Sequence, residues 1–565
     1  MNAHATTDRT DADTAPRRTE ADTAPRVPWL WLLAPLFASA ATRDLWAPDE
    51  PRYAQVGKEI FERADPIVMH LCGEVYPNKP PLVFALAGLF GRFTGWSELA
   101  MRLPTIAAIA VTAWLTLRFA RRFWGESEAR WSAAIYLTTA MSFWNGGRVQ
   151  LDPLLGVLCF GAVTLLDEPA RDERDARRRA RWAGVLAGLG VLVKGPVSFL
   201  FIALPLVVWR YSVGERGGKR AGARSTRGAV EGWLLALAIP LAWAIAAIVR
   251  EPSLLDEFLF KQHVGQTMDG TRHPAPFWFH FAVQPAWILP WTFAFVAGLG
   301  LAWRSWRTKR GGGADDEGLT RAAGWFVATL LLFSCFTSKR DLSLLPVYPA
   351  VGMVAARWLV TAIRAGRPSR AVSVPSALLL ALVGVALAVA PHFQDELAAR
   401  TSSPLPEFGF RAHFAGGALA ALALAALVQA WRGRLRSWAE RLTLAFALGT
   451  SVIALCMFPP INPGKSAREL ASWVAARPER PTSVPIWGAQ PEGFAFYGIP
   501  ASGTDDDAGA RALEAALDRE GASFLAVVEA RRFEKLAPEL RERLVELQRR
   551  SLSSRTMVVV GRRVE

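Results

Sequence analysis

Apolar residues occur along most of the chain in runs of about 15 to 20 residues, with short polar segments between them. Runs of this length predict membrane-spanning helices, because the apolar strands of soluble α/β proteins are shorter. Another apolar stretch, residues 81–95, is short and interrupted by glycines, so we expect it to lie along the membrane interface. We predict thirteen spans, near residues 28–42, 101–117, 131–147, 151–166, 182–194, 196–209, 229–249, 281–303, 322–337, 342–363, 372–391, 413–431 and 442–459.

The polar segments between these runs are of two kinds. If the N-terminus is cytoplasmic, every dense arginine cluster falls on the same face, as the positive-inside tendency requires. Counting residues 81–95 as a crossing would put all these clusters outside, which supports the count of thirteen. The other face then receives acids, histidines and isolated lysines, and we expect the chemistry there. The arginine clusters lie in segments 118–130, 167–181, 210–227, 304–321, 364–370 and 431–441.

The periodicity changes after Pro459-Pro460. The segments "TSVPIWGA", "SFLAVVEA" and "TMVVVGRR" predict strands, whereas "DDDAGARALEAALDRE" and "RRFEKLAPELRERLVELQRR" predict helices. The fold class is therefore an α-helical polytopic membrane protein with a small C-terminal α/β domain on the outer face. We place a disordered cytoplasmic N-terminus at 1–26, the transmembrane domain at 27–460 with its first outer loop at 43–100, and the α/β domain at 461–565.

The composition agrees with a membrane protein and argues against other classes. Hydrophobic residues make up 52% of the chain, which contains 23 tryptophans. A net charge of +15 would suit a nucleic-acid-binding protein. However, the arginines lie between apolar runs, where membrane orientation explains them better, and we expect no nucleic-acid partner. The four cysteines show no paired spacing and three of them lie in apolar segments, so we expect buried thiols.

Carboxylates follow two of the predicted spans. "WAPDEPRY" places Asp49 and Glu50 just past the first span, and "NGGRVQLDP" places Asp152 in a tight turn. Helix capping would explain both sites, with Pro51 in the first turn of the helix "PRYAQVGKEIFERA". The functional interpretation is acids held at the mouth of a membrane cavity, acting as a general base or as metal ligands.

Isolated cations lie on the same predicted face. "GEVYPNKPP" contains Lys79, which is either a phosphate partner or a side chain reaching lipid headgroups. Lys194 in "VLVKGPV" separates two short apolar runs, which could be a broken pair of helices and not two full crossings. A cation at this position favours an anionic ligand. "TSKRD" places Lys339 and Arg340 against the positive-inside tendency, which indicates an anionic lipid headgroup. No glycine-rich nucleotide loop is visible, so a phosphorylated lipid fits better than a cytoplasmic sugar nucleotide.

Histidines are concentrated in "FKQHVGQTMDGTRHPAPFWFHF". His263, His273 and His280 could ligate a metal, although no fixed zinc spacing is present. Anchoring at the membrane interface explains His273 and His280 better.

Taken in order, these motifs resemble a known family. The segments "DEPRYAQVGKEIF", "GEVYPNKPPLVF", "LDPLL", "VKGPV", "HPAPFWFHF" and "SKRDLSLLPVYPA" resemble polyprenyl-phosphate-dependent glycosyltransferases of GT-C fold. The nearest members are bacterial 4-amino-4-deoxy-L-arabinose lipid A transferases and protein O-mannosyltransferase-like relatives. The resemblance covers roughly residues 28–350. It implies a bacterial inner-membrane protein whose active site and α/β domain face the periplasm.

The resemblance also implies roles for individual residues. Asp49 matches an acid proposed as catalytic and Asp152 a second acid in the cavity, while His263 matches a metal-binding histidine. That histidine's glutamate partner is replaced here by Asn78, and Gln266 and Thr267 stand near the place of a usual arginine. The full candidate set contains the catalytic residues Asp49, Asp152 and Glu50; the lipid-phosphate or substrate residues Arg52, Tyr53, Tyr76, Lys79, Lys194, Lys339, Arg340 and Tyr348; and the metal ligand His263.

The function implied is transfer of a sugar from undecaprenyl phosphate, with inversion, to lipid A, another envelope glycan or a protein. Polyprenyl phosphate would be the carrier product, and a divalent metal is a candidate cofactor. We expect membrane lipids as further partners and a monomeric chain. A transporter or flippase of a lipid-linked sugar is the alternative, but two acids at one mouth favour an enzyme.

Overall fold

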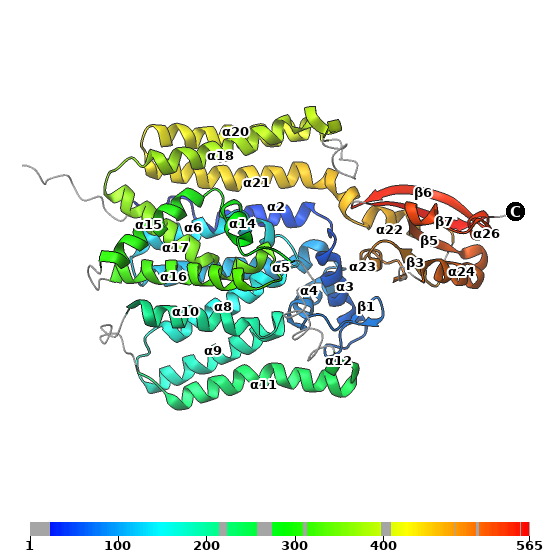
Figure 1. Cartoon of the computed structure of the whole chain (residues 1–565), viewed down its shortest axis with the longest axis horizontal. Helices are drawn as coiled ribbons and strands as arrows, with labels where there is room; N and C mark the ends of the chain where they lie inside the picture. Colours follow the sequence, from blue (N-terminus) through cyan, green and yellow to red (C-terminus); the bar gives the residue numbers. More distant parts are fainter. Residues whose placement is uncertain are drawn as a thin grey trace, which may run out of the picture.

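The computed structural model describes residues 23–213, 223–256, 274–308, 314–396, 408–479, 481–503, 508–553 and 555–563. Figure 1 shows a bundle of long, roughly parallel helices with a small domain of strands and short helices at one end. The bundle therefore has two ends, one of which faces the small domain.

Helices form wherever the apolar runs predict them, and each of the thirteen predicted ranges overlaps at least one helix. The elements of the bundle are η1 (Trp29–Leu33), α2 (Ala34–Thr42), α5 (Glu98–Arg121), α6 (Glu126–Leu137), α7 (Ala140–Gly146), α8 (Leu151–Asp167), α9 (Glu173–Lys194), α10 (Val197–Val213), α11 (Thr226–Arg250), α14 (Phe279–Trp287), α15 (Thr292–Thr308), α16 (Ala314–Cys335), η4 (Asp341–Val347), α17 (Tyr348–Arg364), α18 (Arg370–Val389), η5 (Ala390–Phe393), α20 (Gly409–Trp431) and α21 (Leu435–Lys465).

Seven helices in the described part of the chain are long and apolar enough to cross a membrane, or nine if two bent pairs each count as one span. The pairs are α7 with α8, bent by 114°, and α14 with α15, bent by 118°. The second pair divides the range 281–303, where one straight span was predicted, at a segment that contains Pro290. A many-helix membrane bundle is confirmed, whereas the exact count of thirteen crossings stays a prediction.

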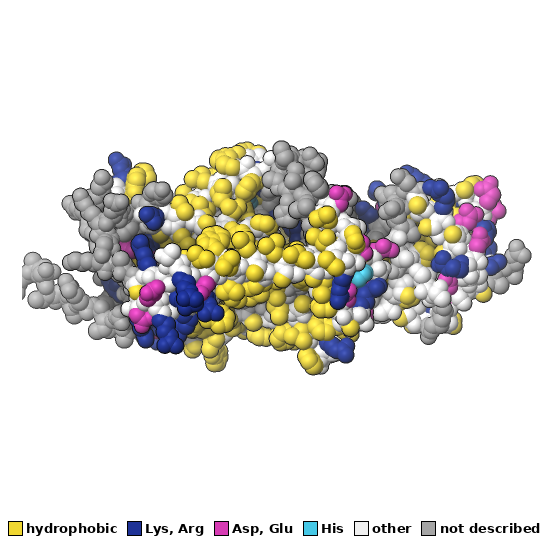
Figure 2. Space-filling view, turned by 90° about the horizontal axis from the view of Figure 1, so that it is seen from below, with side chains coloured by type: hydrophobic (Ala, Val, Ile, Leu, Met, Phe, Trp, Pro, Cys, Tyr) yellow, Lys and Arg dark blue, Asp and Glu magenta, His cyan; other side chains and the backbone are white. Residues whose placement is uncertain are grey.

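The side of the bundle bears a broad apolar surface, which Figure 2 shows running along the helices. Along α11, Trp233 is 63% exposed and Val249 is 76% exposed, with Leu234, Leu237 and Ile245 between them also exposed. Such a surface is costly in water and is favourable against lipid tails. In the same view, Lys and Arg side chains gather at the end of the bundle away from the C-terminal domain.

The loop after α2 folds over the other end of the bundle. Its elements are α3 (Asp49–Glu62), the short antiparallel strands β1 (His70–Leu71) and β2 (Glu74–Val75), and α4 (Leu82–Arg92). With 11 residues α4 is about 16 Å long, which is too short to span a bilayer core of about 30 Å. The short helix α12 (Ser253–Asp256) follows α11 at this end.

The C-terminal domain is a five-stranded sheet in the order β4-β3-β5-β7-β6. β3 pairs in parallel with β4 and β5, and β7 pairs antiparallel with β5 and β6. Separate apolar clusters pack on the sheet, one around Leu513 and Phe524 and one around Leu470 and Phe494. The elements are α22 (Arg468–Ala475), β3 (Val484–Trp487), α23 (Pro491–Phe496), β4 (Ala501–Gly503), α24 (Gly509–Glu520), η6 (Gly521–Ser523), β5 (Leu525–Glu529), α25 (Ala530–Phe533), α26 (Pro538–Glu542), β6 (Leu544–Leu552) and β7 (Arg555–Arg562).

The three predicted strands are present as β3, β5 and β7, and the first predicted helix is present as α24. The prediction of one helix for "RRFEKLAPELRERLVELQRR" is wrong, because its second half forms strand β6. Its Glu, Leu, Gln and Arg residues favour a helix, but pairing along β7 from Leu544 to Leu552 outweighs that local preference.

Candidate active site

Ion pairs tie together the arginine-rich segments at the end of the bundle away from the C-terminal domain. Asp167 contacts Arg122 at 3.2 Å and Arg321 at 2.6 Å, and Glu128 contacts Arg357 at 3.0 Å. These five residues come from different elements, and all except Arg357, which lies inside the predicted span 342–363, are in segments predicted to share one face. This end is consolidated by charge pairs between its own residues.

At the opposite end, a fully buried carboxylate organises the first loop. Glu50 accepts a hydrogen bond from Arg102 Nε at 2.7 Å and from the Val149 backbone N–H at 3.0 Å, and Arg43 Nε lies 3.9 Å away. Burial raises the pKa of Glu50, but the charges of Arg102 and Arg43 outweigh it and lower the pKa to about 2. The start of α3 is thereby fixed against α5 and the turn before α8.

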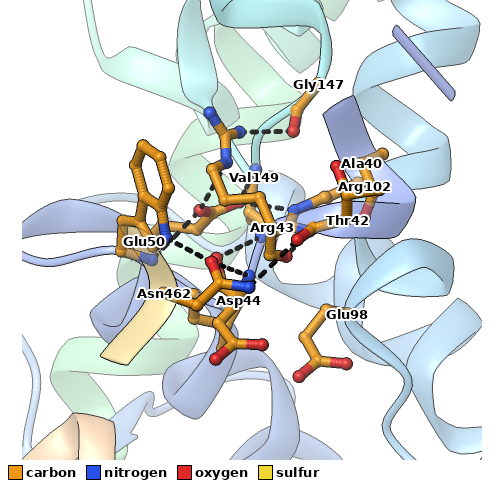
Figure 3. A network of polar contacts seen from close by, with 12 residues as sticks. Ala40, Thr42, Arg43, Asp44, Glu50, Glu98, Arg102, Gly147, Val149 and Asn462 are labelled. Atoms are coloured by element: carbon orange, nitrogen blue, oxygen red, sulfur yellow. Dashed lines mark hydrogen bonds and ion pairs between the residues drawn. The ribbon is translucent and has the colours of Figure 1, made fainter. Parts of the chain in front are cut away.

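The remaining donors of Arg102 reach the end of α2 and the residues that follow it, as Figure 3 shows. Its guanidinium donates to the carbonyls of Ala40 at 2.6 Å, Arg43 at 2.5 Å and Asp44 at 2.9 Å. Asn462 of α21 closes the same network, accepting from the Asp44 N–H at 3.0 Å. Arg102 was not among the predicted site residues, although "AMRLP" places this lone arginine inside an apolar run.

Asp49 is the first residue of α3, and its side chain has a different partner from that of Glu50. Its Oδ2 lies 2.6 Å from the Arg340 guanidinium, and the two side chains are 15% and 45% exposed. No side-chain cap is present at the start of α3, so Asp49 does not serve as a simple N-cap. Burial raises the pKa of Asp49, but the hydrogen bond and charge of Arg340 lower it overall below the ordinary value.

The second acid forms a matching ion pair. Asp152 Oδ1 lies 2.5 Å from Lys194 Nζ, and Asp152 is nearly buried whereas Lys194 is about one quarter exposed. The cap of α8 is supplied by Gln150, whose side chain accepts from the Leu151 N–H. Lys194 ends α9, because Gly195 adopts φ 80°, a conformation that favours glycine.

These two pairs lie in one electrostatic neighbourhood. The pKa of Tyr53 is raised first by burial and then by the charges of Asp49 and Asp152. Burial lowers the pKa of Arg340, but its bond to Asp49 and the charges of Asp49, Tyr53 and Asp152 raise it overall. Because the charges of both acids act on Tyr53 and Arg340, we name the two ion pairs and Tyr53 together the acid–cation cluster (Asp49, Asp152, Tyr53, Lys194 and Arg340).

Two further candidates, Tyr76 and Arg52, come from the same loop as Asp49 and Tyr53 of the cluster. Tyr53 and Tyr76 are buried against Phe84 of α4, with ring centroids 5.4 and 5.8 Å away. Arg52 points to the C-terminal domain, where its Nε donates to Glu492 at 3.1 Å. Glu492 was not predicted, and nothing in its local sequence indicates this contact.

Two other candidates make contacts inside the protein. Lys339 is buried and donates to the Ala275 carbonyl at 2.6 Å. The Tyr348 hydroxyl is buried and donates to the Gln284 side chain at 2.6 Å. Neither contact involves a residue of the acid–cation cluster.

The candidate metal ligand His263 lies outside the described residues. Asn78 and Lys79 lie between β2 and α4 and are half-buried. Among the described residues no group of three His, Cys, Asp or Glu side chains could hold a metal. Since Asn78 lacks a carboxylate, the described donors do not fit a metal site.

An apolar groove runs along the bundle, and none of the five residues of the acid–cation cluster is among its lining residues. It has a volume of about 620 Å³ and is lined by α4, α5, α8 and α9. Its α8 wall begins at Leu154, two residues after Asp152, and its α4 wall includes Leu86. Arg118 and Glu168 line it near the opposite end, so the groove follows most of the length of these helices.

Comparisons with known proteins give three kinds of similarity. The family model for dolichyl-phosphate-mannose-protein mannosyltransferase matches residues 78–245. An undecaprenyl phosphate-α-4-amino-4-deoxy-L-arabinose arabinosyl transferase from Pseudomonas fluorescens (strain Pf0-1) is 29% identical over 61% of this chain and 59% of its own length. One from Sodalis glossinidius is 29% identical over 74% of this chain and 73% of its own length. The chain thus spans about three fifths to three quarters of these relatives.

Two solved structures share the fold. The crystal structure of ArnT from Cupriavidus metallidurans bound to undecaprenyl phosphate matches with a TM-score of 0.73 at 20% identity, and its apo state matches with a TM-score of 0.74 at 21% identity. Each match covers 94% of this chain and 97% of the other. The similarity therefore includes both the helix bundle and the C-terminal domain.

Proposed function

We propose that this chain, which belongs to the polyprenyl-phosphate-dependent glycosyltransferases of GT-C fold, transfers a sugar from undecaprenyl phosphate to an envelope acceptor. Lipid A, another glycan or a protein is the acceptor. The observation that carries the proposal is the acid–cation cluster, together with a long apolar groove whose α8 wall begins two residues after Asp152. Two acids paired with cations beside such a groove suit a reaction on a phosphorylated lipid.

On the donor side, the bond between the anomeric carbon and the phosphate oxygen breaks, and its electron pair stays on the phosphate. Lys194 and Arg340 stabilise this growing negative charge from fixed positions at Asp152 and Asp49. The groove along α5 and α8 holds the prenyl chain, since most of its lining side chains are apolar. Lys79, which precedes α4, is a further contact for the phosphate.

On the acceptor side, an acceptor oxygen forms the new bond to the anomeric carbon, and Asp49 takes or orients the proton it loses. A single displacement of this kind inverts the anomeric configuration. The lowered pKa of Asp49 makes it a weak base for an alcohol. It can accept a proton from a phosphate monoester more readily, because the second pKa of a phosphate is about 6.

Glu50 has a different role from the one its sequence position suggests. Its side chain has no solvent exposure, and its oxygens contact Arg102, Arg43 and backbone N–H groups. We therefore assign it as a positioning residue that fixes Asp49 through the start of α3. Asp152 similarly positions Lys194 at the cluster.

Several finer features belong to the same proposal. The cluster and the C-terminal domain face the periplasm, the bundle makes thirteen crossings, and the domains divide at residues 26 and 460. Because the relatives described above are arabinosyl transferases, a pentose is favoured over a hexose as the transferred sugar. The protein works as a monomer, and its proposed mechanism passes through no metal.

Mass spectrometry of the cell envelope tests the proposal and identifies both substrates. Lipid A, membrane glycans and envelope proteins are compared between a deletion strain and the same strain carrying the wild-type or Asp49→Asn gene. One class should lose a sugar in the deletion strain and regain it with the wild-type gene, but not with Asp49→Asn at equal protein level. Restoration by Asp49→Asn would contradict the assignment of Asp49 and favour a flippase, which needs no catalytic acid.

A further inference from the structure

We propose that a pocket between the first loop and the C-terminal domain binds a phosphate group on the headgroup of a lipid acceptor. This inference rests on the proposed function, because it assigns the part of the acceptor that is recognised. The pocket, which we call the interdomain pocket, has a volume of about 650 Å³. That volume lies within the range of about 300–1,000 Å³ that is common for small-molecule sites.

The charge of the interdomain pocket favours an anion. Lys465, Arg532 and Arg555 line it, and no Asp or Glu is among its lining residues. Glu529 stands behind the two arginines, 3.1 Å from Arg532 Nε and 3.7 Å from the guanidinium of Arg555, and so orients them. Three cations against one acid leave the site positive. Arginine forks together with a lysine point charge are a usual way to bind phosphate.

Lys465 is the cation best placed to meet a ligand. It is exposed, and among the described residues no hydrogen bond or ion pair of its ammonium group is found. It is the last residue of α21, which is long and apolar enough to cross a membrane. The pocket therefore lies where a span leaves the bundle, which is the depth of lipid headgroups.

The first loop connects the interdomain pocket to the proposed catalytic acid. Pro48 and Pro51 line the pocket and flank Asp49 in the sequence. The Ala47 N–H donates to the Lys465 carbonyl at 3.3 Å, and the ion pair of Arg52 with Glu492 holds α3 against the C-terminal domain. A headgroup held in this pocket would lie beside the segment that carries Asp49. The C-terminal domain thus contributes half of an acceptor site.

Equilibrium binding by the full chain in detergent tests the inference directly. Isothermal titration uses three probes: lipid A with its phosphates, dephosphorylated lipid A, and phosphatidylglycerol. Phosphorylated lipid A should bind at least about 10-fold more tightly than the other two, since a charged hydrogen bond contributes about 1.5–3 kcal/mol, or roughly 10-fold or more.

Matched variants locate the binding. Lys465→Gln and Arg555→Gln should each weaken the binding of phosphorylated lipid A on the order of 10-fold, and the double variant on the order of 100-fold. Arg511→Gln is the control, because Arg511 is an exposed arginine of the same domain outside the pocket. Lys465→Arg should retain most of the affinity. The KM for the sugar donor should stay unchanged in all five variants, which also shows that they are folded.

Three results would overturn the inference: wild-type affinity in the double variant, equal affinity for dephosphorylated lipid A, or equal affinity for phosphatidylglycerol. The last would make the pocket an ordinary contact for membrane lipids. The two proposals fail separately. Binding that depends on Lys465 and Arg555 without any sugar transfer contradicts only the proposed function. If sugar is transferred to lipid A but the binding of lipid A is unaffected by substitution of Lys465 and Arg555, only the proposed role of the interdomain pocket is contradicted.

Discussion

Each end of the helix bundle contains a glutamate whose side chain is fully buried against arginine. At the end near the C-terminal domain, Glu50 contacts Arg102 at 2.7 Å, which joins α3 to α5. At the opposite end, Glu128 contacts Arg357 at 3.0 Å and Arg364 at 2.8 Å, which joins α6 to α17. In both places a buried ion pair connects helices that are far apart in the sequence.

The two ends differ in the residue that precedes the glutamate. Before Glu50 stands Asp49, whose partly exposed carboxylate contacts Arg340. Before Glu128 stands Ser127, a buried hydroxyl that lies 2.7 Å from the Thr23 hydroxyl. A buried glutamate–arginine pair therefore stabilises both ends of the bundle. At the end near the C-terminal domain, the residue before the glutamate is also an accessible acid, Asp49. Stability and chemistry should be separable by substitutions at neighbouring positions.

The largest expected effect is on activity. Asp49→Asn should lower kcat by about 10²–10⁴-fold, the usual contribution of a proton-transfer group. The melting temperature should change little, because the Asp49 side chain is partly exposed and Glu50 holds the helix start. The measurement is sugar transfer by purified protein alongside thermal unfolding. Activity close to wild type in a folded variant would remove Asp49 from the mechanism.

The next effect is on stability and should appear at both ends. Glu50→Gln and Glu128→Gln should each cost about 3–5 kcal/mol, because arginines are left buried without their counter-charge. In the folded fraction of each variant, kcat should be altered only for Glu50→Gln, because Glu50 is adjacent to Asp49. Thermal unfolding and initial rates on the same preparations provide the comparison. Equal loss of kcat in both variants would mean that the ends are not functionally distinct.

Glu50 also predicts a pH dependence of stability. Its pKa is about 2 in the folded protein against 4.5 ordinarily. A lowered pKa stabilises the folded state above pH 4.5, and this contribution is lost as the pH falls from about 4.5 toward 2. The acid-induced drop in melting temperature should therefore be smaller in Glu50→Gln than in the wild type. An identical drop in both would contradict the proposed ionisation of Glu50.

A smaller effect concerns the pH profile of activity. Arg340→Gln removes the contact that lowers the pKa of Asp49, while the burial that raises it remains. The acid limb of the kcat profile should therefore move to higher pH, whereas a merely structural role of Arg340 would leave its position unchanged. The Arg511→Gln variant serves as the control. If the acid limb of the Arg340→Gln profile does not move, the ionisation of Asp49 does not control the rate-limiting step.

The smallest effect is expected among exposed pairs at the end opposite the site. Arg121 is 51% exposed and lies 2.7 Å from Glu126. Arg121→Gln should change the free energy of unfolding by no more than about 1 kcal/mol and leave kcat/KM unchanged, because Arg121 does not line the groove. A large loss of activity would show that chemistry also depends on this end.

Local sequence signals predict much of this architecture. Apolar runs predict the helices, and the Lys194-Gly195 step predicts the end of α9 because a glycine stops the helix there. The acids at 49 and 152 were predicted to lie near each other, and the structure brings them into one cluster with Arg340. For the helices and the end of α9 the information lies within a few residues of the feature, whereas the meeting of the two acids follows from the predicted topology, which puts both on one face.

Features that depend on distant partners could not be predicted in the same way. Arg102 is 52 residues from Glu50, and Glu492 is 440 residues from Arg52. Strand β6 was missed because its pairing with β7, and not its own composition, decides its conformation. The interdomain pocket likewise exists because residues near 48 and 555 meet in the fold.

The most direct test of the central claim is product analysis with one purified protein in detergent, given a polyprenyl-phosphate sugar and the acceptor identified in cells. The account predicts that one polyprenyl phosphate is released for each sugar transferred, that the new bond has the inverted configuration, and that Asp49→Asn releases far less. Movement of the labelled donor across proteoliposomes, with no release of polyprenyl phosphate by the folded wild-type protein, would contradict it.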